Sequence, residues 1–472
     1  MLFREFDKFK NIHFVGIGGI GMSGIAEILF NMGFNVTGSD ISEGHNTLYL
    51  RDKGISIYIG HKEENAYGSD VVVYSTAIKE NNPEIIWAKE NFIPVIKRGE
   101  MLAELMRLKY SIAVSGSHGK TTTTSMIAEI FNSGKLDPTV IIGGRLNRNK
   151  INATYGLSSI MISEADESDK SFLLLNPTIT VITNIDKEHF ETYKNIKEIK
   201  EAFIEFNNKV PFYGLNILCL DDNNIVDIIP HLKRRFITYG INSSANIKAA
   251  NIETKNYGMS FDVTAFDKYL GKVVLEIPGM HNVQNALAAV AVSLECGIDF
   301  KTIMEALRNF EGVQRRLTIR FKNENYVVID DYAHHPAEIK ASIKAIRDTF
   351  KGYKIYVIFQ PHRYTRVYYL MNCFAKAFFN VDRLFITDIY SASEEPIIGV
   401  HANVLVNEIK AHGLKDVNYL KNLDDFYEII GTSKDEKIIV MTMGAGDITK
   451  FSYSLAEFLK NNLRCISYDK KN

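Results

Sequence analysis

The chain has 472 residues, 46% of them hydrophobic and 24% charged, which is enough for about three globular domains with buried cores. Its formal net charge of −1 argues against an electrostatic surface for nucleic acid or an anionic membrane. Four cysteines are widely spaced without a C-x-x-C pair, which favours the free thiols of a cytoplasmic protein over disulfides or a zinc site.

The first predicted element is a strand at residues 12–15, followed by a G-x-G-x-x-G turn at 16–21 and a helix at 22–32. Charged residues and glycines interrupt this apolar stretch, which argues against a signal peptide, and no segment is expected to enter a membrane. A second strand ends at Asp40, about 20 residues after the glycines, as in dinucleotide-binding folds. We therefore expect Gly18, Gly19 and Gly21 to hold a pyrophosphate, which NAD and UDP both carry.

The next hydrophobic strand, at residues 70–77, ends in Ser75 and Thr76. The carboxyl ends of parallel strands face the ligand crevice, so these hydroxyls either line the nucleotide site or cap the next helix. A further helix runs through Arg107, and the first domain is expected to end at about residue 108.

A glycine-rich turn with the sequence SGSHGKTTTT begins the second domain, between a strand at 111–114 and a helix from 125. Such a turn directs backbone N–H groups and a helix N-terminus at a polyphosphate. Lys120 would face the β- and γ-phosphates, and the Thr121 hydroxyl would ligate Mg²⁺. The first glycine is two residues late for the general phosphate-loop pattern, because Val114 stands where a glycine is usual, so a plain βα turn is the alternative.

Two further strands of this domain end in candidate metal ligands. Glu164 begins a run of four acids in six residues after the strand at 159–163, and His189 follows the strand at 179–185. A carboxylate beside a phosphate loop suits Mg²⁺. The alternative is that the acidic run is a solvent-exposed turn and that His189 has a structural role, as is more usual for such residues. Farther along, an alanine-rich helix ends before Gly297, with Asn282 predicted as its N-cap, and paired arginines at 315–316 suit a phosphate.

In the third domain, polar or glycine-rich clusters follow the carboxyl ends of four predicted strands, at residues 330–336, 360–366, 388–390 and 443–447. This pattern predicts a doubly wound α/β domain with one functional edge. Arg363 and Arg366 are suited to holding a small carboxylate in bidentate fashion. A pyrophosphate ligand, ATP with Mg²⁺ and an amino acid together point to an ATP-dependent, amide-forming ligase.

Taken together, these motifs resemble those of the muramyl (Mur) ligase family, in family order over nearly the whole chain. The matching segments are 13–24 (HFVGIGGIGMSG), 116–124 (GSHGKTTTT), 164–169 (EADESD), 183–189 (TNIDKEH), 279–286 (GMHNVQNA), 312–316 (GVQRR), 330–336 (DDYAHHP), 360–366 (QPHRYTR) and 444–448 (GAGDI). The family's phosphate loop has the same shortened form. One departure is Glu188, which stands where an aspartate is expected beside the histidine.

The resemblance implies an α/β fold of three domains: a Rossmann-like UDP-binding domain at 1–108, a P-loop ATPase-type mixed sheet at 109–312 and a Rossmann-like amino-acid-binding domain at 313–472. It implies that L-alanine is joined to the lactyl carboxylate of UDP-N-acetylmuramate through an acyl phosphate, in the cytoplasm, by a monomer or weak homodimer.

The resemblance also implies roles for matched residues. ATP would contact residues of the phosphate loop (Gly116, Ser117, His118, Gly119, Lys120, Thr121 and Thr122), of the helix after 279 (Asn282 and Asn285) and of the segment 312–316 (Arg316). The UDP-sugar would lie against the N-terminal glycines, with Asp40, Ser75 and Thr76 nearby. Mg²⁺ would be held by Thr121, Glu164 and His189. Alanine would be oriented by Tyr332, His334, Arg363 and Arg366, and the catalytic set would be Lys120, Glu164, His189, His334 and Arg363.

Three other functions remain open at this point. A family member that reattaches recycled murein peptides to the same sugar nucleotide would share most motifs, although the segment 360–366 favours alanine. An NAD-dependent oxidoreductase would explain the first glycine turn but not the second. A non-catalytic nucleotide-binding scaffold would need neither Lys120 nor the metal ligands.

Overall fold

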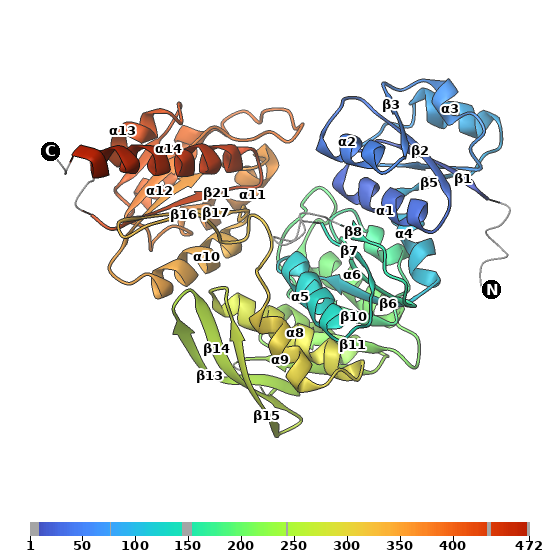
Figure 1. Ribbon diagram of the computed structural model, residues 1–472, viewed down its shortest axis with the longest axis horizontal. Coiled ribbons are helices and arrows are strands. Elements are labelled where there is room, and N and C mark those ends of the chain that lie inside the picture. Colours follow the sequence, from blue (N-terminus) through green and yellow to red (C-terminus); the bar gives the residue numbers. More distant parts are fainter. Residues whose placement is uncertain (1–8, 76, 144–152, 242–243, 432–435, 470–472) are drawn as a thin grey trace. The chain divides into compact units, whose positions relative to one another are not determined.

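The computed structural model describes residues 9–75, 77–143, 153–241, 244–431 and 436–469 (Figure 1). It contains three β-sheets, each with its own helices. The chain divides into two compact units, one up to Ala250 together with Val263–Gly271 and Gln284–Phe310, and one made of the remaining residues. The predicted α/β chain with three sheet-containing domains is confirmed.

The amino-terminal sheet has five parallel strands in the order β3-β2-β1-β4-β5, with β1 at its centre. Its strands and helices are β1 (Asn11–Val15), α1 (Ile20–Asn31), β2 (Asn35–Asp40), α2 (His45–Asp52), β3 (Ser56–Ile59), β4 (Val71–Tyr74), α3 (Pro83–Glu90), β5 (Val95–Lys97) and α4 (Arg98–Arg107). This is the Rossmann-like order, in which the glycine turn after β1 lies at the carboxyl edge of the sheet.

A buried carboxylate lies inside this amino-terminal sheet. Glu84, in the first turn of α3, is fully buried and accepts hydrogen bonds from the Ser39 hydroxyl at 2.6 Å and the Asn65 amide at 2.7 Å. The imidazoles of His61 and His13 lie 3.3 and 3.7 Å from the same carboxylate. Burial raises the pKa of Glu84, but the hydrogen bonds from His13, Ser39 and Asn65 outweigh it, and the net pKa is lowered.

The central sheet has ten strands in the order β15-β14-β13-β12-β11-β10-β6-β9-β7-β8. It is mixed, since β7 and β8 are antiparallel whereas β10, β6 and β9 are parallel neighbours. Its strands are β6 (Tyr110–Ser115), β7 (Thr139–Ile141), β8 (Ala153–Thr154), β9 (Ile160–Glu164), β10 (Ile179–Ile182), β11 (Leu215–Cys219), β12 (Phe236–Gly240), β13 (Ile247–Lys255), β14 (Gly258–Ala265) and β15 (Lys268–Leu275). Its helices are α5 (Lys120–Ser133), α6 (Ile196–Asn208), α7 (Asn223–Ile228), α8 (Met280–Glu295) and α9 (Phe300–Arg308). The loop after β6 is therefore flanked by the loops after β10 and β9.

The carboxy-terminal sheet has six strands in the order β16-β17-β21-β18-β19-β20, and all but β16 are parallel. Its elements are β16 (Thr318–Lys322), β17 (Tyr326–Asp331), α10 (Pro336–Thr349), β18 (Lys354–Phe359), α11 (Tyr364–Ala375), β19 (Arg383–Ile386), α12 (Ala402–Ala411), β20 (Val417–Tyr419), α13 (Asp425–Gly431), β21 (Ile438–Met443) and α14 (Ile448–Asp469). Figure 1 shows α14 lying along this sheet, where Phe451 and Leu455 pack on Val328 and Val440. The parallel strands bring the four predicted polar clusters to one edge.

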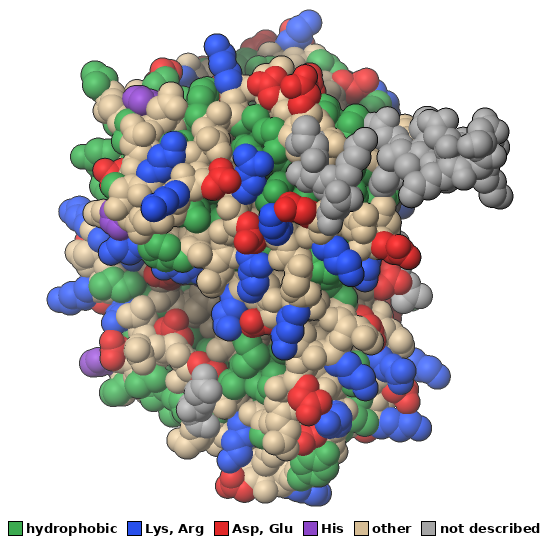
Figure 2. Space-filling view, turned by 90° about the vertical axis from the view of Figure 1, so that its left-hand side faces the viewer, with side chains coloured by type: hydrophobic (Ala, Val, Ile, Leu, Met, Phe, Trp, Pro, Cys, Tyr) green, Lys and Arg blue, Asp and Glu red, His purple; other side chains and the backbone are tan. Residues whose placement is uncertain are grey.

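The distribution of charged side chains on the surface agrees with the formal net charge of −1. On the face shown in Figure 2, lysine and arginine side chains are interspersed with aspartate and glutamate, and hydrophobic side chains lie in small separate groups. Among the described residues, no helix is both long enough and apolar enough to cross a lipid bilayer.

Candidate active site

The turn between β6 and α5 has a backbone conformation that depends on its two glycines. Gly116 and Gly119 have φ angles of 129° and 82°, which favour glycine. A Cβ atom at Gly119 would lie 2.6 Å from Oδ1 of Asn285, and one at Gly116 would collide with the Thr183 hydroxyl. The two glycines therefore allow the loop to approach its neighbours closely before α5 begins at Lys120.

The segment after β10 holds this loop through a set of hydrogen bonds. The backbone N–H of His118 donates to Oδ1 of Asn184 at 2.8 Å, and the Thr183 hydroxyl donates to the His118 carbonyl at 2.6 Å. The N–H of Asp186 donates to the Ser117 hydroxyl at 2.8 Å. The shape of the loop thus depends on the segment 183–189 as well as on its own glycines.

Lys120 is held by acidic residues of the segment after β9. Its ammonium lies 2.9 and 2.8 Å from the two carboxylate oxygens of Glu167 and donates to the Gly116 carbonyl at 2.6 Å. Burial alone would lower the pKa of Lys120, but the charges of Glu167 and Asp166 raise it above its ordinary value. Lys120 is therefore a fixed positive charge at the amino-terminal end of α5.

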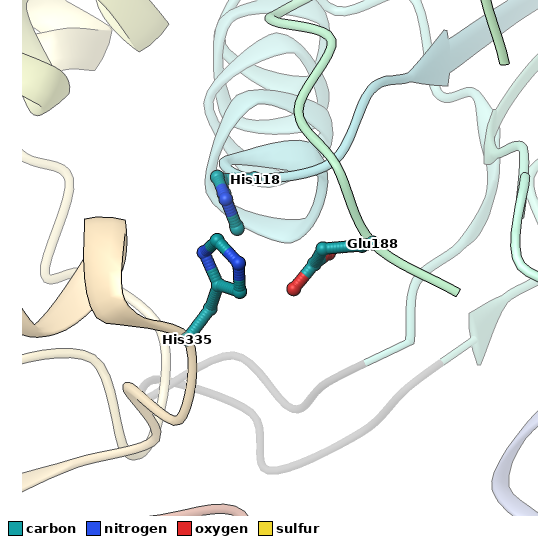
Figure 3. A group of neighbouring side chains, drawn as sticks. All are labelled: His118, Glu188 and His335. Atoms are coloured by element: carbon teal, nitrogen blue, oxygen red, sulfur yellow. The ribbon is translucent and has the colours of Figure 1, made fainter. Parts of the chain in front are cut away.

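His189 lies against the same carboxylate. Its Nε2 is 3.2 Å from Oε1 of Glu167, and the hydrogen bond and charge of Glu167 raise the pKa of the imidazole against the opposing effect of burial. Among the described residues, Glu167, Glu188 and His189 bring ligand atoms within 4.8 Å of one another. Figure 3 shows Glu188 on the segment after β10 and His118 at the amino-terminal end of α5.

The predicted metal ligands occupy separate elements. Glu164 is the last residue of β9, and its Oε1 accepts the Gly143 N–H at 2.8 Å. Thr121 lies half-buried in the first turn of α5. Glu164 is not a member of the cluster formed by Glu167, Glu188 and His189. Carboxylate and hydroxyl oxygens are the donors that Mg²⁺ prefers, so the residues present at this edge fit that ion.

The residues predicted to contact ATP on α8 take different local roles. The prediction that Asn282 caps the helix is wrong, because α8 already begins at Met280 and the Asn282 amide donates to the Pro278 carbonyl at 2.7 Å. Gly279, with φ of 104°, makes the turn instead. Asn285 accepts the Thr123 hydroxyl at 3.2 Å, and both Asn285 and Thr122 are buried.

In the amino-terminal sheet, the backbone N–H of Gly18 donates to Oδ2 of Asp40 at 2.8 Å, and the Asn46 amide donates to the Gly18 carbonyl at 2.8 Å. Gly19 immediately precedes α1, and a Cβ atom at Gly21 would lie 3.1 Å from the Arg98 side chain. Ser75 accepts the N–H of Ala77 at 3.3 Å, as a turn residue does. Thr76 lies outside the described residues.

Two arginines and Tyr332 form one part of the edge of the carboxy-terminal sheet. The guanidinium groups of Arg315 and Arg316 lie 4.7 and 5.1 Å from the centre of the Tyr332 ring. Arg316 pairs with Glu338 at 3.2 Å, while Arg315 donates to the carbonyls of Gly444 and Gly446. Arg315 thereby ties the loop after β21 to the loop after β17.

Histidines and arginines from the loops after β17 and β18 form the other part. His362 stacks on Tyr390 with ring centres 5.5 Å apart, and its ring centre lies 6.0 Å from that of His334. Burial and the charge of Arg366 lower the pKa of His362 to about 3, so its neutral Nδ1 accepts from Nη1 of Arg366 at 3.1 Å. Arg363, with φ of 68°, lies 4.0 Å from Glu394.

Comparison with known proteins relates the chain to one family. The Mur ligase family, catalytic domain, matches residues 11–110, the Mur ligase middle domain matches 114–293, and the Mur ligase, glutamate ligase domain, matches 315–446. The UDP-N-acetylmuramate–L-alanine ligase of Geobacter sp. (strain M21) is 48% identical over 455 residues, which cover 96% of this chain and 99% of that protein. The chain belongs to the Mur ligase family.

Other similar proteins agree with this assignment. The UDP-N-acetylmuramate–L-alanine ligase of Aquifex aeolicus (strain VF5) is 50% identical over 454 residues, which cover 96% of this chain and 98% of that protein. The structure of UDP-N-acetylmuramate-alanine ligase MurC from Thermotoga maritima has a TM-score of 0.80 and 32% identity, and the match covers 96% of this chain and 99% of that chain. A murein peptide ligase from Psychrobacter arcticus 273-4 shares the fold, with a TM-score of 0.67, 22% identity and coverage of 95% and 98%. Like other Mur ligases, the chain uses ATP.

The structure also brings to the Mur ligase sites two residues that the sequence did not single out. Glu167 contacts both Lys120 and His189, and Arg98 lies beside Gly21. Glu167 belongs to the acidic run of which only the first acid was chosen. The position of Arg98 at the carboxyl end of β5 could have indicated its place at the sheet edge.

Proposed function

We propose that the protein joins L-alanine to the lactyl carboxylate of UDP-N-acetylmuramate, with conversion of ATP to ADP and phosphate. The proposal rests on the full-length similarity, at 48–50% identity, to ligases named for this reaction. The phosphate loop with a partly buried Lys120 and the arginine-rich edge of the carboxy-terminal sheet are the sites that such a reaction needs.

The chemistry proceeds in two steps. A lactyl carboxylate oxygen attacks the γ-phosphorus of ATP, ADP leaves, and an acyl phosphate forms. The neutral amine of alanine then attacks the acyl carbon, phosphate leaves from the tetrahedral intermediate, and the amine loses a proton. Lys120, at the amino-terminal end of α5, neutralises charge on the transferring phosphoryl group.

We propose the following roles for the remaining site residues. Thr121, Glu164 and His189 would hold Mg²⁺, which neutralises polyphosphate charge when bound. Asn282, Asn285 and Arg316 would contact ATP, while Asp40 and Ser75, with the glycines at 18, 19 and 21, would bind the UDP-sugar. Tyr332, His334, Arg363 and Arg366 would bind the alanine carboxylate and orient its amine.

We also propose the domain boundaries 1–108, 109–312 and 313–472, a cytoplasmic location where ATP and the sugar nucleotide are made, and a monomer or weak homodimer. Light scattering on the purified protein over a range of concentrations measures the oligomeric state directly.

The test is an assay of phosphate release by purified protein with ATP, Mg²⁺ and UDP-N-acetylmuramate. Addition of L-alanine should start the release, and mass spectrometry should find the alanyl sugar nucleotide. A response to the tripeptide L-alanyl-γ-D-glutamyl-meso-diaminopimelate but not to alanine would instead assign the recycling activity. Glycine and L-serine in competition measure the selectivity of the amine site.

A further inference from the structure

Glu167 occupies a position that the proposed mechanism does not yet use. Its side chain is buried, with 1% of the residue exposed, and it lies between two site residues from different segments. One side faces the Lys120 ammonium at 2.8 and 2.9 Å, and Oε1 also contacts Nε2 of His189 at 3.2 Å. The single carboxylate therefore connects the phosphate loop to the segment after β10.

The backbone around Glu167 is fixed. The hydroxyl of Tyr193, which is 2% exposed, donates to the Glu167 carbonyl at 2.8 Å, and the N–H of Lys170 donates to the same oxygen at 3.2 Å. The Thr192 hydroxyl donates to the Ser168 carbonyl at 2.6 Å. These bonds tie the acidic segment to the segment that carries His189, so the carboxylate has a defined place.

Lys120 has three N–H donors, and its contacts are already directed at protein oxygens. The Gly116 carbonyl accepts at 2.6 Å, and the two oxygens of Glu167 accept at 2.8 and 2.9 Å. A β- or γ-phosphate oxygen that binds Lys120 must share or replace the contact with Glu167. The carboxylate thus opposes tight ground-state binding of polyphosphate while it holds the ammonium in place.

The contact with His189 has a separate consequence. In the neutral ring, a proton on Nε2 that donates to Glu167 leaves the lone pair on Nδ1. A carboxylate that fixes the tautomer of a histidine in this way also fixes which nitrogen is free to act as a ligand.

We propose that Glu167 is a positioning residue of the ATP site, which competes with the polyphosphate for Lys120 and sets the tautomer and orientation of His189. The predicted change in turnover rests on the proposed function. The predicted change in ADP affinity depends only on the contacts of the phosphate loop.

The decisive variant is Glu167→Gln, which keeps the shape of the side chain but removes its charge. Calorimetric titration with ADP in EDTA should show binding about tenfold tighter than in the wild type, equivalent to the removal of one competing charged contact. The alanine-dependent kcat should fall about 10- to 100-fold, as for loss of a group that orients a ligand residue. A residue with only a structural role would not give tighter ADP binding together with slower turnover.

The matched control is Asp169→Asn, which removes one charge from the same acidic run. Asp169 is exposed and accepts the Ser171 N–H at 2.9 Å, a bond that asparagine also forms. We expect this variant to match the wild type in both measurements. Unchanged or weaker ADP binding in Glu167→Gln, or the same changes in Asp169→Asn, would overturn the proposal.

Glu167→Asp keeps the charge, and it tests the proposed role of Glu167 if the Glu167→Gln variant does not fold. It should keep the metal-free ADP affinity of the wild type and lose turnover, because the shorter carboxylate cannot reach both Lys120 and His189. Turnover equal to that of the wild type would contradict the proposal. Absence of alanine-dependent phosphate release in the wild type would refute the proposed function instead, and the metal-free titration would still test the competition at Lys120.

Discussion

Lys120 is the residue on which the two proposed steps depend most directly, because its charge lies at the amino-terminal end of α5 where a polyphosphate would bind. We predict that Lys120→Ala lowers the alanine-dependent rate of phosphate release by about 10²- to 10³-fold, the usual effect of removing one electrostatic contact to a transition state. Steady-state kinetics with a phosphate-release assay measures this. The control is Lys197→Ala, at a side chain that is 83% exposed on α6. A non-catalytic scaffold would show no alanine-dependent rate for Lys120→Ala to lower.

Glu84 allows a prediction about stability at the residue scale. Its lowered pKa means that the ionised carboxylate stabilises the fold at a pH above the ordinary value of 4.5, and that this contribution is lost as pH falls through the lower folded value. Glu84→Gln should lower the free energy of unfolding by about 1–3 kcal/mol at pH 7, because the buried partners lose a charged acceptor.

The pH dependence distinguishes this carboxylate from others. The difference in the free energy of unfolding between wild type and Glu84→Gln, measured with denaturant, should become smaller as pH falls below 4.5. Glu104→Gln, at a side chain that is 47% exposed, should show little difference at any pH. If this difference in the free energy of unfolding became larger in acid, it would contradict the assignment of an ionised Glu84.

At the scale of single elements, α6 begins with a side-chain cap. The Oδ1 of Asn195 accepts the N–H of Glu198 at 3.1 Å, which satisfies one of the free donors of the first turn. Asn195→Ala should lower the free energy of unfolding by about 1 kcal/mol. Urea unfolding checks this. Asn195→Ser, which retains a capping oxygen, should recover most of the loss.

The phosphate loop depends on glycine for its shape rather than for stability alone. At Gly119, φ is 82° and a Cβ atom would lie 2.6 Å from Asn285. Gly119→Ala should therefore weaken ADP binding at least about tenfold by moving the loop. A titration with ADP measures this, and Gly134→Ala at the opposite end of α5, where φ is −75°, is the control.

How much the sequence could predict differs between elements and contacts. Four strands of the carboxy-terminal sheet could be predicted from apolar runs that end in polar clusters, because parallel strands place these ends at one edge. The other two strands, β16 and β20, were not predicted. The start of α8 was misplaced, since an asparagine before an apolar run looks like a cap, whereas Gly279 makes the turn. Glu167 was missed because four acids in six residues look alike until the chain packs, and only then is one of them buried against Lys120.

At the scale of the whole molecule, the reaction requires three ligands to meet within about 3 Å. The chain divides into two compact units. We expect hinges at the two proposed domain boundaries, near Leu108 and Val313. We predict that small-angle scattering gives a smaller radius of gyration with a non-hydrolysable ATP analogue plus UDP-N-acetylmuramate than with neither. Identical curves would contradict closure, and UDP-glucose in place of the substrate provides the control.

The strand order of the carboxy-terminal sheet also bears on how the chain is synthesised. β21 leaves the ribosome after β17 and β18 and lies between them in the sheet, although they are made about 80 to 110 residues earlier. Until Ile438–Met443 has emerged, β17 and β18, whose residues are almost all buried in the folded sheet, lack the strand that joins them. Nascent or prematurely terminated chains would thus present open sheet edges, and we infer that this stretch of synthesis is where the protein has its greatest need for chaperones.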